Sequence, residues 1–260
     1  MDLNSLLLSE CDQLKEVLYN PFKIAETFTK NLVYTKVYLQ LMDLFSQVKF
    51  LLHKEVVLEW RSKYALNGIL LYVVSTIFVC YLSFKQIPPP TWNALFWIIM
   101  LFASVNAISK SFIQENKSRQ IYYYTIASPQ AIILSKIVYN MGLMLLLTFI
   151  ALTFYTLVFK NPIGDLSYYL LAVLLGSISF AAVFTMISGI ASKANNSGSL
   201  MAILSFPVII PLLIVLIKFS KNAMDGLDRS VSSNEIWVLL AINLVVITAS
   251  LLLFPFLWRD

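Results

Sequence analysis

Six long apolar runs alternate with short polar or charged segments along the chain. Each is close to the roughly 20 residues that cross a bilayer as one helix. The runs are 65–84, 91–109, 137–159, 166–192, 194–217 and 236–258. The fourth and fifth nearly touch, so a turn must separate them within the Asn-, Ser- and Gly-rich segment at 192–199. The pattern predicts an all-α membrane protein with six transmembrane helices.

Charge is scarce and unevenly distributed. Only 13% of the 260 residues are charged and 59% are hydrophobic, whereas a soluble domain has about 25% charged residues. Lys and Arg beside the runs are more frequent in the segments that share a side with the N-terminus. By the positive-inside rule, we expect both termini in the cytoplasm. The net charge of +5 follows from this bias, so we expect no nucleic-acid partner.

The segment before the first run, residues 46–63, has an amphipathic pattern. Apolar residues recur at every fourth position, at Val48, Leu52, Val56 and Trp60. A basic helix with such a stripe is typical of one lying in the membrane interface. The alternative is a cytoplasmic extension of the first span. Residues 1–45 are charged, and we expect them to form an accessory N-terminal cytoplasmic extension before a permease domain at 46–260.

The segment 110–136 is the longest predicted inner loop. It combines charges, three consecutive tyrosines and a Ser-Pro pair. We expect a short helix at 120–127, stopped by proline, which could dock another protein. The alternative is a surface loop with tyrosine anchors in the membrane. The residues expected to dock are Gln120, Ile121, Tyr122, Tyr123, Tyr124, Ser128 and Pro129.

The fourth run contains small residues at every fourth position, namely Ser177, Ala181, Thr185 and Gly189. Such a ridge lets another helix approach closely in a membrane. We therefore expect helix packing here, rather than a substrate path.

Two prolines, Pro207 and Pro211, interrupt the fifth run. Each removes a backbone hydrogen bond to the carbonyl one turn earlier, and the Ser205 hydroxyl is close enough in sequence to help satisfy a freed carbonyl. We expect a kinked or short, partly re-entrant segment. The kink could serve gating or could be static.

Several kinds of chemistry lack their motifs. There is no phosphate-binding Gly-Lys-Ser/Thr loop, a single histidine, His53, and two cysteines, Cys11 and Cys80. We therefore expect no metal site, no catalytic residues and no tightly bound cofactor. No charged residue lies in the middle of a run, which disfavours an ion-coupled carrier. Amides and hydroxyls in the runs could join helices or line a path: Asn106, Asn140, Thr148, Thr153, Ser205 and Asn243.

The combination of an interfacial helix, six spans and an inner docking loop resembles the permease of an ABC exporter of the ABC-2 class. Two stretches narrow the resemblance. They are "SPQAIILSKIVYN" and the sequence from "LLGSISFAAVFTMISGIA" through "SKANNSGSLMAILSFPVIIPLLI", which includes the two prolines. Over residues 46–258 the chain resembles the CcmB family, the membrane permeases of the haem exporter of cytochrome c maturation.

The resemblance implies a non-catalytic subunit in the bacterial inner membrane that works with a separate ABC ATPase. It also implies two further partners, a tryptophan-rich haem-handling membrane protein and a haem chaperone on the outer face. ATP hydrolysis would then be coupled to haem delivery or to release of the haem-loaded chaperone, with haem as cargo. Two alternatives remain open, an ABC-2 permease for a lipid, glycan or drug, and a non-transporting assembly scaffold.

Overall fold

A computed structural model describes residues 44–62, 64–84, 87–109, 112, 127–192 and 197–257. Within these ranges every regular element is a helix, which confirms the all-α class. The elements are α3 (Leu44–Ser62), α4 (Tyr64–Ser83), α5 (Pro89–Ile108), α8 (Pro129–Phe159), α9 (Leu166–Ala191), α10 (Ser197–Met224), the 3-10 turn η1 (Arg229–Ser232) and α11 (Ser233–Leu257).

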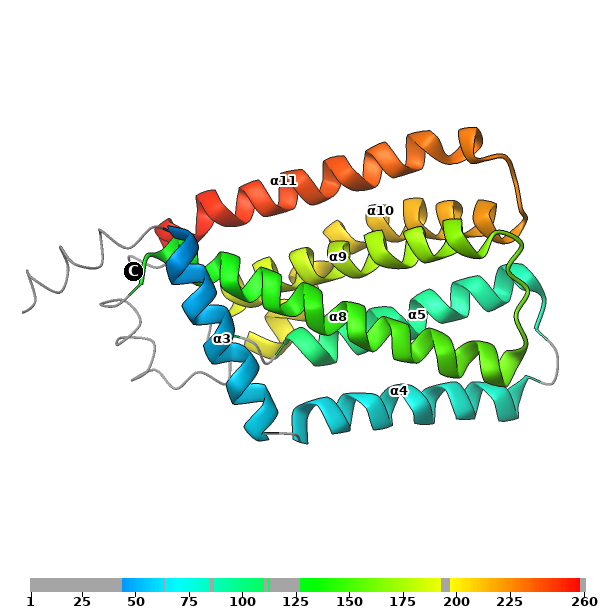
Figure 1. Cartoon of the computed structure of the whole chain (residues 1–260), viewed down its shortest axis with the longest axis horizontal. Helices are drawn as coiled ribbons and strands as arrows, with labels where there is room; N and C mark the ends of the chain where they lie inside the picture. Colours follow the sequence, from blue (N-terminus) through cyan, green and yellow to red (C-terminus); the bar gives the residue numbers. More distant parts are fainter. Residues whose placement is uncertain are drawn as a thin grey trace, which may run out of the picture.

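The six helices from α4 to α11 run alternately between the two ends of an elongated bundle (Figure 1). α3 lies against α8 at one end, where α8 begins and α11 finishes. We call this the α3 end. The connections at 160–165 and 225–232 lie at the opposite end, which we call the far end.

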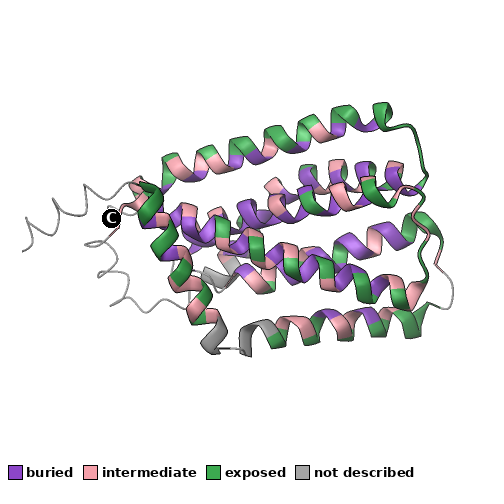
Figure 2. Ribbon diagram, viewed as in Figure 1, coloured by how far each residue is buried: buried purple, intermediate pink, exposed green. Residues whose placement is uncertain are grey.

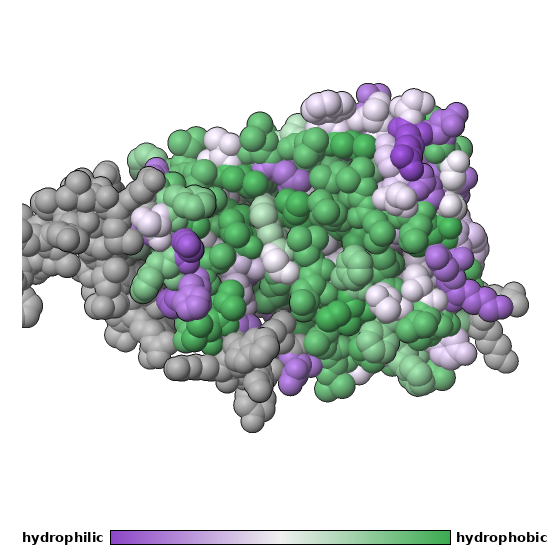
Figure 3. Space-filling view, viewed as in Figure 1, coloured by the Kyte–Doolittle hydropathy of each residue, from purple (hydrophilic) through white to green (hydrophobic). Residues whose placement is uncertain are grey.

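Five segments are long and apolar enough to cross a membrane among the described residues. They are α5, α8, α9, Ile203–Met224 and Arg229–Leu257. The described apolar part of α4, Asn67–Ser83, is shorter. The expected count of six spans is therefore not confirmed, although the multi-pass character is. The surface agrees with this character, because hydrophobic side chains cover the middle of the bundle and hydrophilic ones gather at the far end (Figure 3).

Helix boundaries differ from the apolar runs in two places. α8 begins at Pro129, about two turns before the predicted residue 137, so Lys136 lies inside the helix. α10 begins at Ser197, within the predicted turn, and continues past residue 217 to Met224. An apolar run ends where charge begins, whereas a helix ends where its backbone hydrogen bonds end.

α9 forms the centre of the bundle. It packs against α5, α8, α10 and α11. In an 18-residue apolar stretch of α9, 72% of the residues are buried, compared with 22% in the equivalent stretch of the span that includes α11. Figure 2 shows the same contrast. A helix that contacts neighbours on nearly all sides has to be apolar or small all around, as α9 is.

Aromatic side chains fill the core toward the far end. The rings of Trp92 and Tyr155 have centroids 4.7 Å apart, and the Tyr155 hydroxyl donates to the Trp92 carbonyl at 3.0 Å. Trp97 is fully buried and its indole nitrogen donates to Ser220 Oγ at 2.8 Å. Because most of these polar atoms have partners, the rings can be buried at low cost and held in fixed orientations.

Gly176 lets α9 approach the Trp97 ring closely. A Cβ built at Gly176 would lie 2.7 Å from Trp97 Cη2 and 2.9 Å from Leu216 Cδ2. Neither neighbour can move aside freely, because Trp97 is hydrogen-bonded and both side chains are fully buried.

We predict that Gly176→Ala destabilises the bundle, since overpacking a core costs about 1–3 kcal/mol. Gly68→Ala is the matched control, because no atom lies within 4 Å of a Cβ there and alanine is favoured in a helix by about 1 kcal/mol. The thermal unfolding midpoint in one detergent would fall for Gly176→Ala and hold or rise for Gly68→Ala. An unchanged midpoint for Gly176→Ala would show that the Trp97 contact is not tight.

Candidate functional site: the α3–α8 junction

The first turn of α8 is tied to α3. Ser128 is the N-cap residue of α8, with its Oγ accepting from the Ala131 amide at 3.3 Å, and Pro129 occupies the first turn. The amide and hydroxyl of Ser128 both donate to Gln47 Oε1 of α3, each at 3.1 Å. The residue that starts α8 is therefore also the residue that α3 holds.

A buried ion pair joins the same two helices two turns further along. Lys136 is 2% exposed, and its Nζ lies 3.3 Å from Glu55 Oε1. Lys54 also contacts Glu55, at 2.9 Å. The Lys136 ammonium lies 4.7 Å from the Phe112 ring centroid, which adds a cation–π contact. A buried charge is tolerated only with such partners, so this pair helps fix where α3 lies.

The charges around Glu55 decide its protonation. Burial alone would raise the pKa of the Glu55 carboxyl, but the positive charges of Lys136 and Lys54 and their hydrogen bonds outweigh it and hold the pKa below its ordinary value. Glu55 is therefore a carboxylate at neutral pH, and the ion pair is fully formed there.

A third polar contact and a small apolar cluster complete the junction. The Tyr139 side chain of α8 is hydrogen-bonded to Glu59 of α3. The pairs 47–128, 55–136 and 59–139 thus advance in the same order along both helices. Apolar side chains of α3, α8 and α11, together with Phe112, pack in one cluster beside these pairs. They are Leu51, Phe112, Ala131, Ile132, Ile133, Ile137 and Phe254.

The predicted docking residues are only partly within the described chain. Gln120, Ile121, Tyr122, Tyr123 and Tyr124 lie outside it, as does nearly all of the predicted short helix. Ser128 and Pro129 lie at the start of α8, where the predicted loop rejoins the described chain. Their docking role stays a prediction, but their position connects that loop directly to the junction.

The predicted stripe on α3 does not coincide with the side that packs most deeply on its neighbours. Val48 and Leu52 are half-buried, Val56 is exposed, and the side chain of Trp60 lies outside the described residues. The most buried side chains of α3 are Gln47 and Leu51. Gln47 was missed because a polar side chain in an apolar pattern gives no signal until its partner is known.

The small-residue ridge on α9 is entirely buried. Asn140 of α8 donates to Thr185 Oγ1 at 2.8 Å, and the hydroxyl oxygens of Ser177 and Thr148 lie 3.0 Å apart. A Cβ at Gly189 would lie 3.0 Å from the Phe254 ring of α11. Ala181 lies on the same ridge with no exposed surface. The ridge thus contacts both α8 and α11.

The two prolines lie within one long helix. α10 continues through Pro207 and Pro211 from the α3 end to Met224 at the far end, so the expectation of a short re-entrant segment is wrong. Both prolines are exposed, whereas Ser205 is buried against the bundle. In a membrane, the carbonyls that such prolines free are tolerated where neighbouring helices, hydroxyl side chains or water molecules satisfy them. A role in bending or gating stays a prediction.

The polar residues singled out within the runs have two different environments. Asn140, Thr148 and Asn243 are buried, and Asn243 Nδ2 of α11 donates to Ser179 Oγ of α9 at 2.8 Å. Asn106 and Thr153 are exposed. The buried group joins helices, as interhelical hydrogen bonds do in membranes. In the described part of the chain, no three His, Cys, Asp or Glu side chains are placed to hold a metal ion.

A family model described as CcmB protein matches residues 46–258. The matched range runs from α3 to the end of α11 and includes the whole junction. No curated protein and no solved structure matches the chain.

We predict that Glu55→Gln destabilises the protein at neutral pH by about 2 kcal/mol, because it removes hydrogen bonds to a buried charged group. A carboxyl whose folded pKa is lowered contributes stability above its unfolded pKa, here about 4.3, and loses it as pH falls through the folded value. The difference in unfolding free energy between the two proteins should therefore be constant from pH 7 to about pH 5 and shrink below about pH 4.3.

Unfolding midpoints in denaturant, measured for both proteins across this pH range, would check the prediction. Lys49→Gln is a suitable control, since it removes an exposed charge from α3. If the difference between Glu55→Gln and the unsubstituted protein did not change with pH, the ion pair would not be what holds α3 in place.

Proposed function

This chain belongs to the CcmB family, and from that premise we propose that it is the permease subunit of an ABC-type complex. The family comprises membrane components of the haem export system in cytochrome c biogenesis, so the chain is a multi-pass inner-membrane protein of that system. In the proposed function, a partner subunit hydrolyses ATP, and the complex couples this to haem delivery or to release of the haem-loaded chaperone. The family match over nearly all the described helices is the observation that supports it most.

The proposed topology has six spans, with α4 as the first. The alternation of the six helices between the two ends supports this count (Figure 1). The α3 end would be cytoplasmic, with both termini there, because the Lys- and Arg-rich segments lie on that side. α3 would lie in the membrane interface before the first span, and residues 1–45 would be a cytoplasmic extension outside the permease domain.

Coupling would begin at the loop that precedes α8. Residues Gln120–Tyr124 would receive the ATPase, and Ser128 would pass the motion both into α8 and, through Gln47, into α3. The hydrogen-bonded and ion-paired junction supports this route because it joins the two helices at three successive points. Bending of α10 at Pro207 and Pro211, against α9 with its packed ridge, would complete the rearrangement.

Haem would be cargo or a handled ligand, without a tight site on this chain. The tryptophan-rich haem protein would be a membrane neighbour, and the chaperone would bind at the far end, which faces outward in the proposed topology. Membrane lipid would cover the exposed apolar faces. Two alternatives compete with this proposal. One is a different cargo, such as a lipid, glycan or drug, and the other is a purely scaffolding role.

We predict that replacing Tyr122, Tyr123 and Tyr124 together with alanine abolishes stable binding of the ATPase subunit. Each buried aromatic anchor of an interface contributes about 2 kcal/mol, so retention should fall by more than about tenfold. The measurement is affinity purification of the tagged full chain from mild detergent, with the co-purifying ATPase quantified by mass spectrometry.

The matched control is Tyr81→Ala, which removes an exposed tyrosine near the last residue of α4, at the far end of the bundle. This variant should retain the ATPase. Normal recovery of an active ATPase complex with the triple variant would refute the docking assignment. Recovery of an ATPase together with glycan or lipid enzymes would refute the cargo, and recovery of no ATPase from the unsubstituted chain would favour the scaffold.

A further inference from the structure

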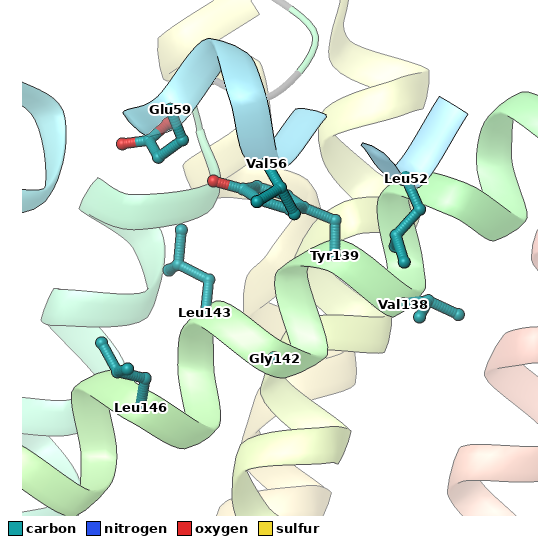
Figure 4. Close-up of a pocket in the computed structure, with 8 residues that line it drawn as sticks. All are labelled: Leu52, Val56, Glu59, Val138, Tyr139, Gly142, Leu143 and Leu146. Atoms are coloured by element: carbon teal, nitrogen blue, oxygen red, sulfur yellow. The ribbon is translucent and has the colours of Figure 1, made fainter. Parts of the chain in front are cut away.

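A pocket of about 320 Å³ lies between α3 and α8. Its wall on α8 is formed by one face of the helix, and three residues of α3 form the opposite wall (Figure 4). The lining residues are Leu52, Val56, Glu59, Val138, Tyr139, Gly142, Leu143 and Leu146. This volume lies at the lower end of the range for small-molecule sites, roughly 300–1,000 Å³.

The α8 wall of the pocket is mostly apolar. The α8 residues from Val138 to Leu146 rise about 12 Å along the helix axis. Gly142 leaves the middle of this wall open, because a Cβ there would meet no atom within 4 Å. Val138, Gly142 and Leu146 are exposed, so the pocket opens on the side of the bundle. An opening on the side of a membrane-spanning helix faces hydrocarbon chains.

The polar groups of the pocket are together on the α3 side. Tyr139 points across toward α3, and Glu59 lies on α3 beyond it, away from Leu146 (Figure 4). The two side chains are hydrogen-bonded. A carboxylate offers about four acceptor positions, so Glu59 can accept from a further donor while it binds Tyr139. Among the described residues that line the pocket, none carries a positive charge.

This arrangement matches one class of membrane lipid. A negative carboxylate on the α3 side of the pocket attracts an ammonium group and repels a headgroup whose only charge is a phosphate. A primary ammonium also has three N–H donors, which suit the Glu59 carboxylate and the Tyr139 hydroxyl oxygen. The apolar wall that α8 forms suits an acyl chain. A protein segment would have to satisfy its own backbone polar groups in this apolar wall.

We propose that the pocket binds one phospholipid with a primary-amine headgroup, whose ammonium contacts Glu59 and Tyr139 and whose acyl chain lies along Val138–Leu146. Such a lipid fills the space between α3 and α8 beside the three polar pairs. It therefore strengthens the junction on the side where Val56 is otherwise exposed. The inference requires only that the chain lies in a membrane, and it is independent of the cargo.

The test is native mass spectrometry of the purified full chain, titrated with an equimolar mixture of phosphatidylethanolamine and phosphatidylglycerol that have the same acyl chains. We expect one saturable phosphatidylethanolamine site with about tenfold preference, as for a charge-assisted hydrogen bond. Gly142→Phe places a ring in the pocket and should abolish the site. Glu59→Gln should remove most of the headgroup preference while leaving weaker binding of both lipids.

Gly68→Phe is the matched control, because Gly68 is an exposed helical glycine outside the pocket, and it should retain the site. Thermal midpoints of all variants would establish that each is folded. Equal binding of both lipids by the unsubstituted chain would overturn the headgroup assignment. Lipid binding that never saturates, or that persists in folded Gly142→Phe, would overturn the pocket assignment. If Gly142→Phe loses the lipid but still binds the ATPase, the lipid site and the proposed function are independent of each other.

Discussion

The buried ammonium of Lys136 places the strongest constraint on the α3 end of the structure. A charge that is 2% exposed must be neutralised where it lies, and Glu55 does so from a helix far earlier in the chain. α3 therefore cannot leave α8 without taking the Glu55 carboxylate away from a buried ammonium group. Gln47 and Glu59 extend the same attachment in both directions along α3. Their combined effect is to make α3 part of the bundle, although it precedes the first candidate span.

The far end is held differently. The amides of Gly164 and Asp165 donate to carbonyls near the end of α10, at 3.0 Å each. A Cβ at Gly164 would lie 2.7 Å from the Met224 carbonyl oxygen, so the close contact depends on glycine there. Asp165 also pairs with Arg229 at 3.1 Å. Backbone hydrogen bonds and one exposed ion pair hold the loops at the far end, whereas buried side-chain pairs hold the α3 end, where the proposed ATPase contact lies. In the proposed function, a movement of the loop before α8 would therefore shift α3 and the start of α8 together.

Much of the fold could be predicted from hydropathy, because each apolar run corresponds to one helix. The start of α8 could not be placed in that way. The apolar run begins only after Lys136, whereas the helix already includes that residue. The re-entrant interpretation of Pro207 and Pro211 failed because two missing hydrogen bonds on an exposed face do not interrupt a helix of 28 residues. Of the junction, only Ser128 and Pro129 were singled out from the sequence, as part of the loop expected to dock a partner and not as the start of α8. Gln47, Glu55 and Glu59 became recognisable only beside their partners on α8.

The central claim is that α3 and the first part of α8 move as one unit when the partner subunit binds ATP. Spin labels at two exposed positions, Lys49 on α3 and Gln130 on α8, would test it most directly, in a variant with Cys11 and Cys80 replaced by serine. Distances between the labels would be measured by electron paramagnetic resonance in the complex with its ATPase, without nucleotide and with trapped ATP. The account predicts one narrow distance distribution that is the same in both states. A distribution that broadens or shifts with ATP would contradict it, because α3 would then separate from α8 during the cycle.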